Sequence, residues 1–499
     1  MISLKEMIAL EENAEEIGLS RKLLMENAGS AIASYLKTKG LINDVMLVAG
    51  TGNKAGDGFV ALRHILAFGG TCKVLLAERE ENLRTQEAKE NFNVLKQIPS
   101  LKIFIAQDLS DEDIRSLFRK ANVIIDGLIG TGLRGKLSYR ILRLIRLINE
   151  ANCFKLSIDI PTGIDPDTGE NAGDYVRANV VITMHRMKKG LIKYKEQLEI
   201  HEANIGIPLE LEYIAGRGDA KILFDSKPKY AKKGDAGRLL IIGGSKVYHG
   251  APILAGLAAL RSGVDLVYMY LPYKIADIAR SISPEFIVFP YNDEELTLKA
   301  AEEATQIIEK VDTILIGNGI GLGHDEAVEK IFEIAEQNNK IIVADADALK
   351  TRAVKKNWKM KIVYTPHVGE FKIMTGVELK SYDEIKERMK QVEEASNKLN
   401  AIFLVKGHYD IISDGKKTKI CKGGTQAMTV GGTGDVLAGL CSGLIARTKK
   451  VFESSIAASY INKKAGERAT EKYGNQIKAS DLVEFIPKII KELDPTYQN

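Results

Sequence analysis

The chain has 499 residues, of which 45% are hydrophobic and 27% are charged, so it is long enough for two or three domains with sizeable cores. A formal net charge of +4 is close to neutral at this length and argues against a nucleic-acid-binding protein. The N-terminal residues lack a signal-peptide pattern, and no apolar run reaches membrane-spanning length. The four cysteines show no metal-ligand spacing, so reduced structural thiols and a cytoplasmic protein are expected.

Apolar, β-branched runs alternate with helix-length segments in the first half of the chain. Continuous apolar strands separated by helices indicate a parallel sheet covered on both faces. The predicted strands are Val45–Ala49, Val74–Ala77, Ile103–Ala106, Val123–Asp126, Leu156–Ile160 and Val180–Met184.

Three of these strands carry residues suited to a binding site. Gly50–Phe59 forms a glycine-rich turn that opens a helix, an arrangement that favours phosphate binding although its spacing is not G-x-G-x-x-G. A second glycine-rich segment spans Gly130–Gly135. Asp159 lies between two isoleucines near a strand end. Desolvation there is expected to raise its pKa toward the range useful for acid/base catalysis. A buried, hydrogen-bonded structural acid is the alternative interpretation.

A polar segment from about Ile207 to Lys233, with two prolines, predicts a boundary, and we expect domains at 1–220 and 221–499. The lysines between Lys227 and Lys233 are typical of a solvated linker. No sequence repeat relates the two halves, so two different folds are expected. The second half again predicts strands, at Leu239–Ile242, Leu266–Tyr270, Ile314–Ile316, Ile341–Ala344, Ile362–Tyr364 and Phe403–Val405.

The most informative segment is Gly431–Asp435, a glycine-rich turn running into a helix with a carboxylate in its first turn. Unpaired backbone N–H groups and the helix dipole favour a bound phosphate there. Asp435 would then accept the proton of an alcohol that meets the phosphate. A favourable helix cap is the plain alternative. Five of the six predicted strands of this half end in unusual segments, which are Gly-Gly-Ser, Gly-Asn-Gly-Ile-Gly, Asp-Ala-Asp-Ala-Leu, Thr-Pro-His-Val-Gly-Glu-Phe and Lys-Gly. Each alone could be a helix cap or a tight turn, but turns and caps explain poorly why all of them fall at one edge of the sheet.

This series resembles the ribokinase-like fold and, within it, the ADP/ATP-dependent NAD(P)H-hydrate dehydratases. Members usually have Gly-Pro-Gly-Leu-Gly where this chain has Asn318 and Ile320, and Lys-Ser-Ala-Thr-Thr or similar where it has Lys406–Asp410. The resemblance implies that NADH or NADPH hydrated at ring carbon 6 is phosphorylated on the hydroxyl, after which phosphate leaves and the dihydronicotinamide returns.

The resemblance also implies residue roles in the second half. Asp435 would be the catalytic base, and Glu370 would place Mg²⁺ or its waters, a structural turn being the equal alternative. The hydrated cofactor would be lined by Ala251, Gly321 and His367. The adenine nucleotide would be held by Lys406, Gly407, His408, Tyr409, Asp410 and Gly434.

The first half resembles the NAD(P)H-hydrate epimerases, Rossmann-like domains often fused ahead of the dehydratase, and Met25–Gly29 fits their N-terminal helix. The family interconverts the R and S hydrates, of which the dehydratase accepts only S. Asp159 would be the acid/base at the hydrated carbon. The cofactor phosphates and ribose would be bound by Asn53, Lys54, Ala55, Gly56 and Asp57, and by Gly130, Thr131, Gly132, Leu133, Arg134, Gly135 and Lys136.

The family also binds K⁺ through an Asn, an Asp and a Ser or Thr. Asp126 and Thr162 match two of these ligands, but Lys54 stands where the Asn is expected. A charged ammonium has donors and no lone pair. Lys54 would therefore fold back toward Asp126 and Thr162 and supply its own charge, or point to solvent and leave a K⁺ site intact.

The resemblance thus implies a two-domain α/β repair enzyme that acts on hydrated NADH or NADPH with ADP, or less favourably ATP, and Mg²⁺, as a homo-oligomer without nucleic-acid or membrane partners. Two alternatives stand beside it. One is a ribokinase-like kinase for a small alcohol with a regulatory first half, and the other is a first half that acts only as a scaffold.

Overall fold

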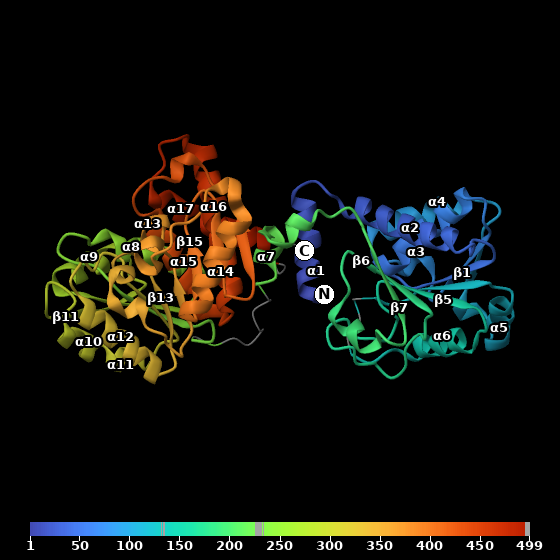
Figure 1. The fold of residues 1–499 in the computed structure, drawn as a ribbon, viewed down its shortest axis with the longest axis horizontal. Coiled ribbons are helices and arrows are strands. Elements are labelled where there is room, and N and C mark those ends of the chain that lie inside the picture. Colours follow the sequence, from blue (N-terminus) through green and yellow to red (C-terminus); the bar gives the residue numbers. More distant parts are fainter. Residues whose placement is uncertain (131, 133–134, 225–231, 233, 495–499) are drawn as a thin grey trace. The chain divides into compact units, whose positions relative to one another are not determined.

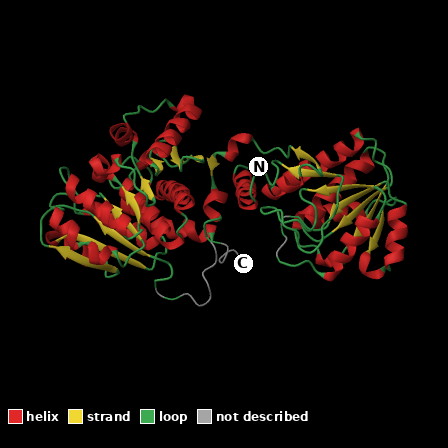
Figure 2. Cartoon of the chain, turned by 60° about the horizontal axis from the view of Figure 1, so that its bottom comes forward, coloured by secondary structure: helices red, strands yellow, loops and turns green. Residues whose placement is uncertain are grey.

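The structure, a computed structural model, describes residues 1–130, 132, 135–224, 232 and 234–494. It forms two compact units, Met1–Leu209 and Glu210–Asn499, in each of which strands lie between helices (Figures 1 and 2). The units divide before the residue-220 boundary that the sequence suggests. The reason is that Ile214–Ala215 forms a short strand, β8, paired with a strand of the second sheet. The predicted linker at 227–233 lies outside the described residues except for Lys232.

The first unit contains one seven-stranded sheet in the order β3-β2-β1-β4-β5-β6-β7, and every neighbouring pair is parallel. Its first six strands follow the order of the Rossmann fold. The strands are β1 (Val45–Ala49), β2 (Cys72–Leu76), β3 (Lys102–Ile105), β4 (Val123–Gly127), β5 (Phe154–Ile158), β6 (Val180–Met184) and β7 (Glu199–Ala203). The helices are α1 (Leu4–Glu16), α2 (Arg21–Thr38), α3 (Asn53–Ala67), α4 (Gln86–Lys96), α5 (Asp111–Arg119) and α6 (Tyr139–Glu150).

The second unit contains a ten-stranded sheet in the order β11-β10-β9-β12-β13-β14-β15-β16-β17-β8. Its remaining strands are β9 (Arg238–Ile242), β10 (Leu266–Pro272), β11 (Phe286–Tyr291), β12 (Thr313–Ile316), β13 (Ile341–Ala344), β14 (Ile362–Tyr364), β15 (Ile402–Val405), β16 (Asp410–Ser413) and β17 (Thr418–Cys421). Strands β9 to β15 run parallel, whereas β15-β16 and β16-β17 are antiparallel. The two units therefore have different topologies, as the missing sequence repeat predicts.

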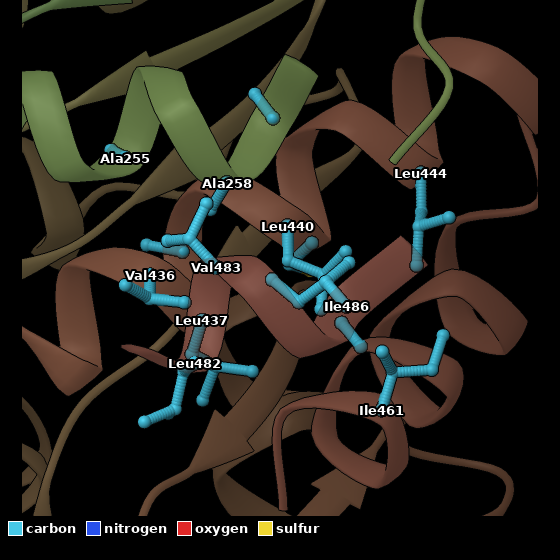
Figure 3. Packing of buried hydrophobic residues seen from close by; sticks show 14 of the residues in the cluster. Ala255, Ala258, Val436, Leu437, Leu440, Leu444, Ile461, Leu482, Val483 and Ile486 are labelled. Carbon is cyan, nitrogen blue, oxygen red and sulfur yellow. The ribbon is translucent and has the colours of Figure 1, made fainter. Parts of the chain in front are cut away.

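Helices cover both faces of the second sheet. They are α7 (Arg217–Lys221), α8 (Gly250–Arg261), α9 (Tyr273–Ile282), α10 (Leu298–Glu303), α11 (Thr305–Ile308), α12 (Asp325–Gln337), α13 (Val368–Thr375), α14 (Ile385–Leu399), α15 (Thr433–Thr448), α16 (Val451–Tyr473) and α17 (Ala479–Leu493). Helix α15 is buried along most of its length. Figure 3 shows Val436, Leu440 and Leu444 of α15 packed among side chains of α8, α16 and α17. Because α15 is enclosed from Val436 onward, the place of its N-terminus is set by this packing.

All twelve predicted strands are confirmed to within two residues at either end. The strands that the sequence did not predict lie at the edges or carry polar residues. Strand β7 has exposed glutamates and β11 contains Pro290, which an edge strand tolerates. All four cysteines are free. Within the described ranges, no helix is long and apolar enough to cross a membrane.

Candidate functional sites

The glycine-rich turn of the second unit opens α15, as the sequence predicts. Gly432 precedes the helix with a φ of 96°, a left-handed conformation that glycine adopts without steric cost. Asp435 is half-buried in the first helical turn. No N-cap side chain satisfies the first backbone N–H groups of the helix, so its N-terminus presents them beside a carboxylate.

Residues from four strand ends, those of β12, β13, β14 and β15, gather around Asp435. Asn318, after β12, donates from Nδ2 to Asp435 Oδ1 at 2.7 Å and to Asp345 Oδ2 at 3.0 Å. Asp345, after β13, also accepts from Lys406 Nζ at 2.7 Å and from Thr365 Oγ1 at 2.8 Å. Four parallel strands therefore deliver one continuous polar network to the N-terminus of α15.

The pKa of Asp435 is raised to about 6. Burial is the largest cause, the Asn318 hydrogen bond and the Lys406 ammonium oppose it, and the Asp345 carboxylate adds to it. A carboxylate with this pKa is ionised at neutral pH and is a stronger base than an exposed aspartate. The position and chemistry of Asp435 suit proton abstraction from an alcohol.

His367 and Glu370 form a reciprocal cap on α13. His367 Nδ1 accepts from the backbone N–H groups of Gly369 and Glu370, and Glu370 Oε2 accepts from His367 N at 2.9 Å. The structural turn weighed for Glu370 is therefore present. His367 keeps 60% of its side chain exposed, so its ring is accessible to a ligand while its Nδ1 lone pair is used by the helix.

The remaining residues expected at the dehydratase site differ in exposure. Gly321, with a φ of 88°, donates from its backbone to Asp347 Oδ2 at 3.1 Å, and Ala251 lies in the first turn of α8. Gly407 and His408 are exposed. Asp410 is buried and accepts from Gly407 N at 2.9 Å and Ser459 Oγ at 2.6 Å. The Asp410 carboxylate thus stabilises the turn before β16, in which Gly407 and His408 are exposed.

A ring cluster flanks this turn. The rings of His408 and Tyr409 lie 4.6 Å apart, and each contacts Tyr382. Lys406, which starts the segment, lies close to the α15 N-terminus, since a Cβ added to Gly434 would lie 3.4 Å from Lys406 Nζ. The lysine charge therefore lies near the backbone groups of Gly434.

In the first unit, Asp159 directly follows β5 and has a φ of 61°. This left-handed conformation is strained for a residue with a side chain and is typical of functional positions. Asp159 Oδ1 accepts from Lys188 Nζ at 2.6 Å, from Met184 N at 3.1 Å and from Thr183 Oγ1 at 3.2 Å. The buried lysine was not singled out by the sequence, because nothing distinguishes it there from its basic neighbours.

The raised pKa expected for Asp159 is wrong. Burial does push the pKa up and is the largest single effect, but Lys188 and the hydrogen bonds together outweigh it, so the pKa lies below its usual value. The pKa values of two neighbouring acids are raised instead. Desolvation and the Asp159 charge raise the pKa of Asp57 well above its usual value and that of Glu11 to about 7. The site thus combines one ionised carboxylate with two acids that hold protons more readily.

Lys54 is buried and turned inward. Its Nζ donates to Asp126 Oδ2 at 2.9 Å and Thr162 Oγ1 at 3.0 Å, and to the carbonyl oxygens of Ile160 at 2.7 Å and Ile129 at 3.2 Å. Of the two orientations weighed for Lys54, the structure shows the inward one. Its ammonium joins the start of α3 to the loops that follow β4 and β5.

The glycine-rich segments lie around this lysine. Asn53 starts α3 and is exposed, whereas Ala55 and Gly56 are buried. Gly130 lies against the Lys54 side chain, since an added Cβ would meet Lys54 Cδ at 3.3 Å. The exposed residues of the second segment are Gly132, Gly135 and Lys136. Thr131, Leu133 and Arg134 lie outside the described residues.

Both units match models of known families. Residues 239–488 match the NAD(P)H-hydrate dehydratase family, and residues 21–190 match the YjeF-related protein N-terminus. The chain is 39% identical to the bifunctional NAD(P)H-hydrate repair enzyme of Pyrobaculum aerophilum, over 97% of each chain. It is 35% identical to that of Methanothermobacter thermautotrophicus, over 99% of this chain and 95% of the relative. The ADP-dependent (S)-NAD(P)H-hydrate dehydratase of Cenarchaeum symbiosum matches 56% of this chain and 97% of its own length at 39% identity. The chain belongs to the family of bifunctional NAD(P)H-hydrate repair enzymes.

Proposed function

We propose that the chain repairs hydrated nicotinamide nucleotides in two steps, one in each unit. The first unit interconverts the R and S hydrates at a site that contains Asp159. The second unit returns the S hydrate to NADH or NADPH at the expense of ADP. Family membership supports both activities, and the observation that carries the second is Asp435 with a pKa of about 6 at the N-terminus of α15.

In the dehydration step, the oxygen of the ring hydroxyl attacks the terminal phosphorus of ADP, and Asp435 accepts the proton of that hydroxyl. AMP leaves and the hydroxyl becomes a phosphate ester. Charge on the transferred phosphoryl group is stabilised by the backbone N–H groups at Thr433 and Gly434, each such donor being worth a few kcal/mol. Loss of phosphate and of a proton from the adjacent ring carbon restores the double bond. Ala251, Gly321 and His367 line the hydrate, and Lys406 to Asp410 hold the nucleotide.

Mg²⁺ fits this arrangement as an ion that arrives with the nucleotide. It usually keeps several waters and binds one or two carboxylates together with substrate phosphates. Within the described ranges, no group of three or more His, Cys, Asp or Glu side chains is placed to hold a metal ion, so phosphate oxygens would have to complete the coordination. Glu370 would contact Mg²⁺ or its waters through Oε1, which lies 3.6 Å from His367 Nε2, since Oε2 is used by the α13 cap.

The nucleotide dependence is tested with separated R and S hydrates, supplied with ADP or ATP, while the absorbance of the restored dihydronicotinamide is followed. We expect the S hydrate to react directly and the R hydrate to react only as fast as it is epimerised. ADP should give the higher kcat/KM, with AMP and phosphate as products. A stable phosphate ester that accumulates would instead indicate a kinase for a small alcohol.

We also propose that the epimerase unit works without K⁺. The oxygens of Asp126 and Thr162, together with two backbone carbonyls, already receive hydrogen bonds from Lys54 Nζ. A second cation at the same oxygens would have to displace a buried, paired ammonium, and breaking a buried ion pair costs about 3–5 kcal/mol. The residues present therefore do not fit a K⁺ ion while Lys54 stays in place.

K⁺ and Na⁺ titrations of the thermal unfolding of the first unit within the intact chain test this proposal without an activity assay. The unmodified protein should respond equally to both ions. Lys54→Asn should gain a K⁺-specific rise in Tm and a K⁺-dependent epimerisation rate. A K⁺-specific stabilisation of the unmodified protein, or a well-ordered K⁺ at Asp126 and Thr162 in its crystals, would contradict the proposal.

A further inference from the structure

Asn318 occupies the position at which related dehydratases usually carry proline, and its side chain reaches the centre of the second site. Its two amide hydrogens are shared between two carboxylates, Asp435 at 2.7 Å and Asp345 at 3.0 Å. Proline has no side-chain donor and cannot make either contact. The difference from the family pattern therefore has a chemical consequence that the spacing of the glycines does not reveal.

The orientation of the Asn318 amide follows from its partners. Ionised carboxylates accept hydrogen bonds and donate none. Turning the amide by 180° would place its carbonyl oxygen against two carboxylate oxygens and lose both contacts. The Nδ2 group must therefore face Asp345 and Asp435, and it supplies both of its hydrogens to them.

This orientation leaves Asn318 Oδ1 buried and without a hydrogen-bond partner among the described residues. A buried polar atom left unpaired costs free energy, and native structures contain few of them. A residue selected only for packing would avoid this cost. The two hydrogen bonds to carboxylates that would otherwise repel each other offset this cost.

The backbone around Asn318 is also fixed. Its carbonyl accepts from Gly244 N at 2.9 Å, and both neighbours, Gly317 and Gly319, have positive φ values of 121° and 76°. The side chain itself is fully buried. The Asn318 side chain is therefore buried and attached to a hydrogen-bonded turn. A residue that positions another side chain needs this kind of support.

We infer that Asn318 is a positioning residue for phosphoryl transfer: its amide bridges Asp345 and Asp435 and holds the Asp435 carboxylate in one orientation as an ionised base. This inference rests on the proposed role of Asp435. The charged groups around Asp435 are Asp345, which disfavours its ionisation, and Lys406, which favours it. Asn318 adds a neutral side-chain donor and links Asp435 to the Asp345–Lys406 pair.

Steady-state dehydration of the S hydrate by the intact enzyme, measured from pH 5 to pH 9, tests the inference. Asn318→Ala should lower kcat by about 10- to 100-fold, the effect of one hydrogen bond to a charged group. The acidic limb of the kcat profile, which reports Asp435, should move up by about one unit. The KM for ADP should change by less than about twofold, because uniform binding is untouched.

Ile320→Leu is the matched control. It restores the other family residue of the same turn. Ile320 is fully buried in the hydrophobic core, and its side chain has no hydrogen-bonding group to offer a carboxylate. A volume-conserving apolar exchange is well tolerated, so kcat and its acidic limb should both stay unchanged. If Ile320→Leu moved the pH profile as Asn318→Ala does, the effect would belong to the turn and the inference would be wrong.

Asn318→Asp keeps the shape of the side chain and covers the case in which the alanine variant does not fold. A carboxylate there would repel both neighbours as it ionises, so the deficit in kcat should grow as the pH rises. Wild-type kcat at every pH in either folded variant would overturn the role of Asn318 while leaving dehydration intact. Absence of ADP-dependent dehydration in the unmodified enzyme would instead overturn the proposed function.

Discussion

Asp159 and Asp435 are both aspartates placed at strand or helix ends of parallel α/β units, yet their charges are stabilised differently. Asp159 contacts a buried ammonium, and its pKa is lowered. Asp435 contacts a neutral amide, and its pKa is raised to about 6. A neighbouring positive charge stabilises the ionised form of a buried carboxylate, so its pKa stays below neutral pH. A neutral donor offsets the cost of burial only in part, so the pKa of the carboxylate stays closer to neutral pH. The same residue type thus has a lowered pKa beside an ammonium and a raised one beside an amide.

The largest expected effect is the separation of the two activities. Asp435→Asn should lower nucleotide-dependent dehydration by about 10²- to 10⁴-fold, the usual contribution of a general base, and leave epimerisation intact. Asp159→Asn should do the reverse. Both rates are measured on separated hydrates with the same enzyme preparation. If Asp435→Asn kept more than about a tenth of the dehydration rate, Asp435 would not be the base.

A smaller effect is expected when the buried partner of Asp159 is removed. Lys188→Met leaves the buried Asp159 carboxylate without a countercharge and should lower the free energy of unfolding of the first unit by about 3–5 kcal/mol. Because the folded pKa of Asp159 lies below its unfolded value, the pair stabilises above pH ~4, and this contribution is lost as the pH falls. The variant should therefore lose less stability on acidification, as denaturant unfolding at several pH values would show.

Lys189→Met is the control for this variant. Lys189 is adjacent in sequence, but its side chain is 45% exposed and pairs with Glu6 at the surface, where an ion pair contributes at most about 1 kcal/mol. Similar losses in the two variants would mean that the Lys188 charge has no special role, and the contrast between the two aspartates would fail.

The smallest expected effect concerns Glu11 of α1, whose pKa is raised to about 7 by burial and by Asp159. The folded protein then binds a proton more tightly than the unfolded chain, so stability falls as the pH rises from about 4.5 to 7. Glu11→Gln should remove this fall and raise the Tm at pH 8 more than at pH 5. Glu15→Gln, an exposed change on the same helix, should not. An equal gain at both pH values would mean that the pKa of Glu11 is not raised in the folded protein.

The sequence predicts the fold well where strands are buried on both faces. Strand β1 is fully buried and its bounds match the prediction, whereas β7 carries exposed glutamates and was missed. The glycine-rich turn before Asp435 was also predictable, because a helix N-terminus needs no distant partner. Lys188 and the side chain of Asn318 were not, since their roles depend on residues brought close by the sheet.

Lys54 is the intermediate case. Its departure from the family pattern and the length of its side chain suggested an inward ammonium, but the same residue usually points to solvent. The sequence left both orientations open because the deciding contacts, the carbonyls of Ile129 and Ile160, carry no side-chain signature.

The short strand β8 affects how the chain can be divided. Its two residues pair with Ile420 and Cys421 of β17 and cover the outer edge of the second sheet. A fragment that starts at residue 221 would expose that edge, whose unpaired backbone groups invite pairing with another chain. A fragment that starts at Glu210 would keep it covered. Separate expression of the dehydratase unit should therefore give monodisperse material from the earlier start and aggregates from the later one.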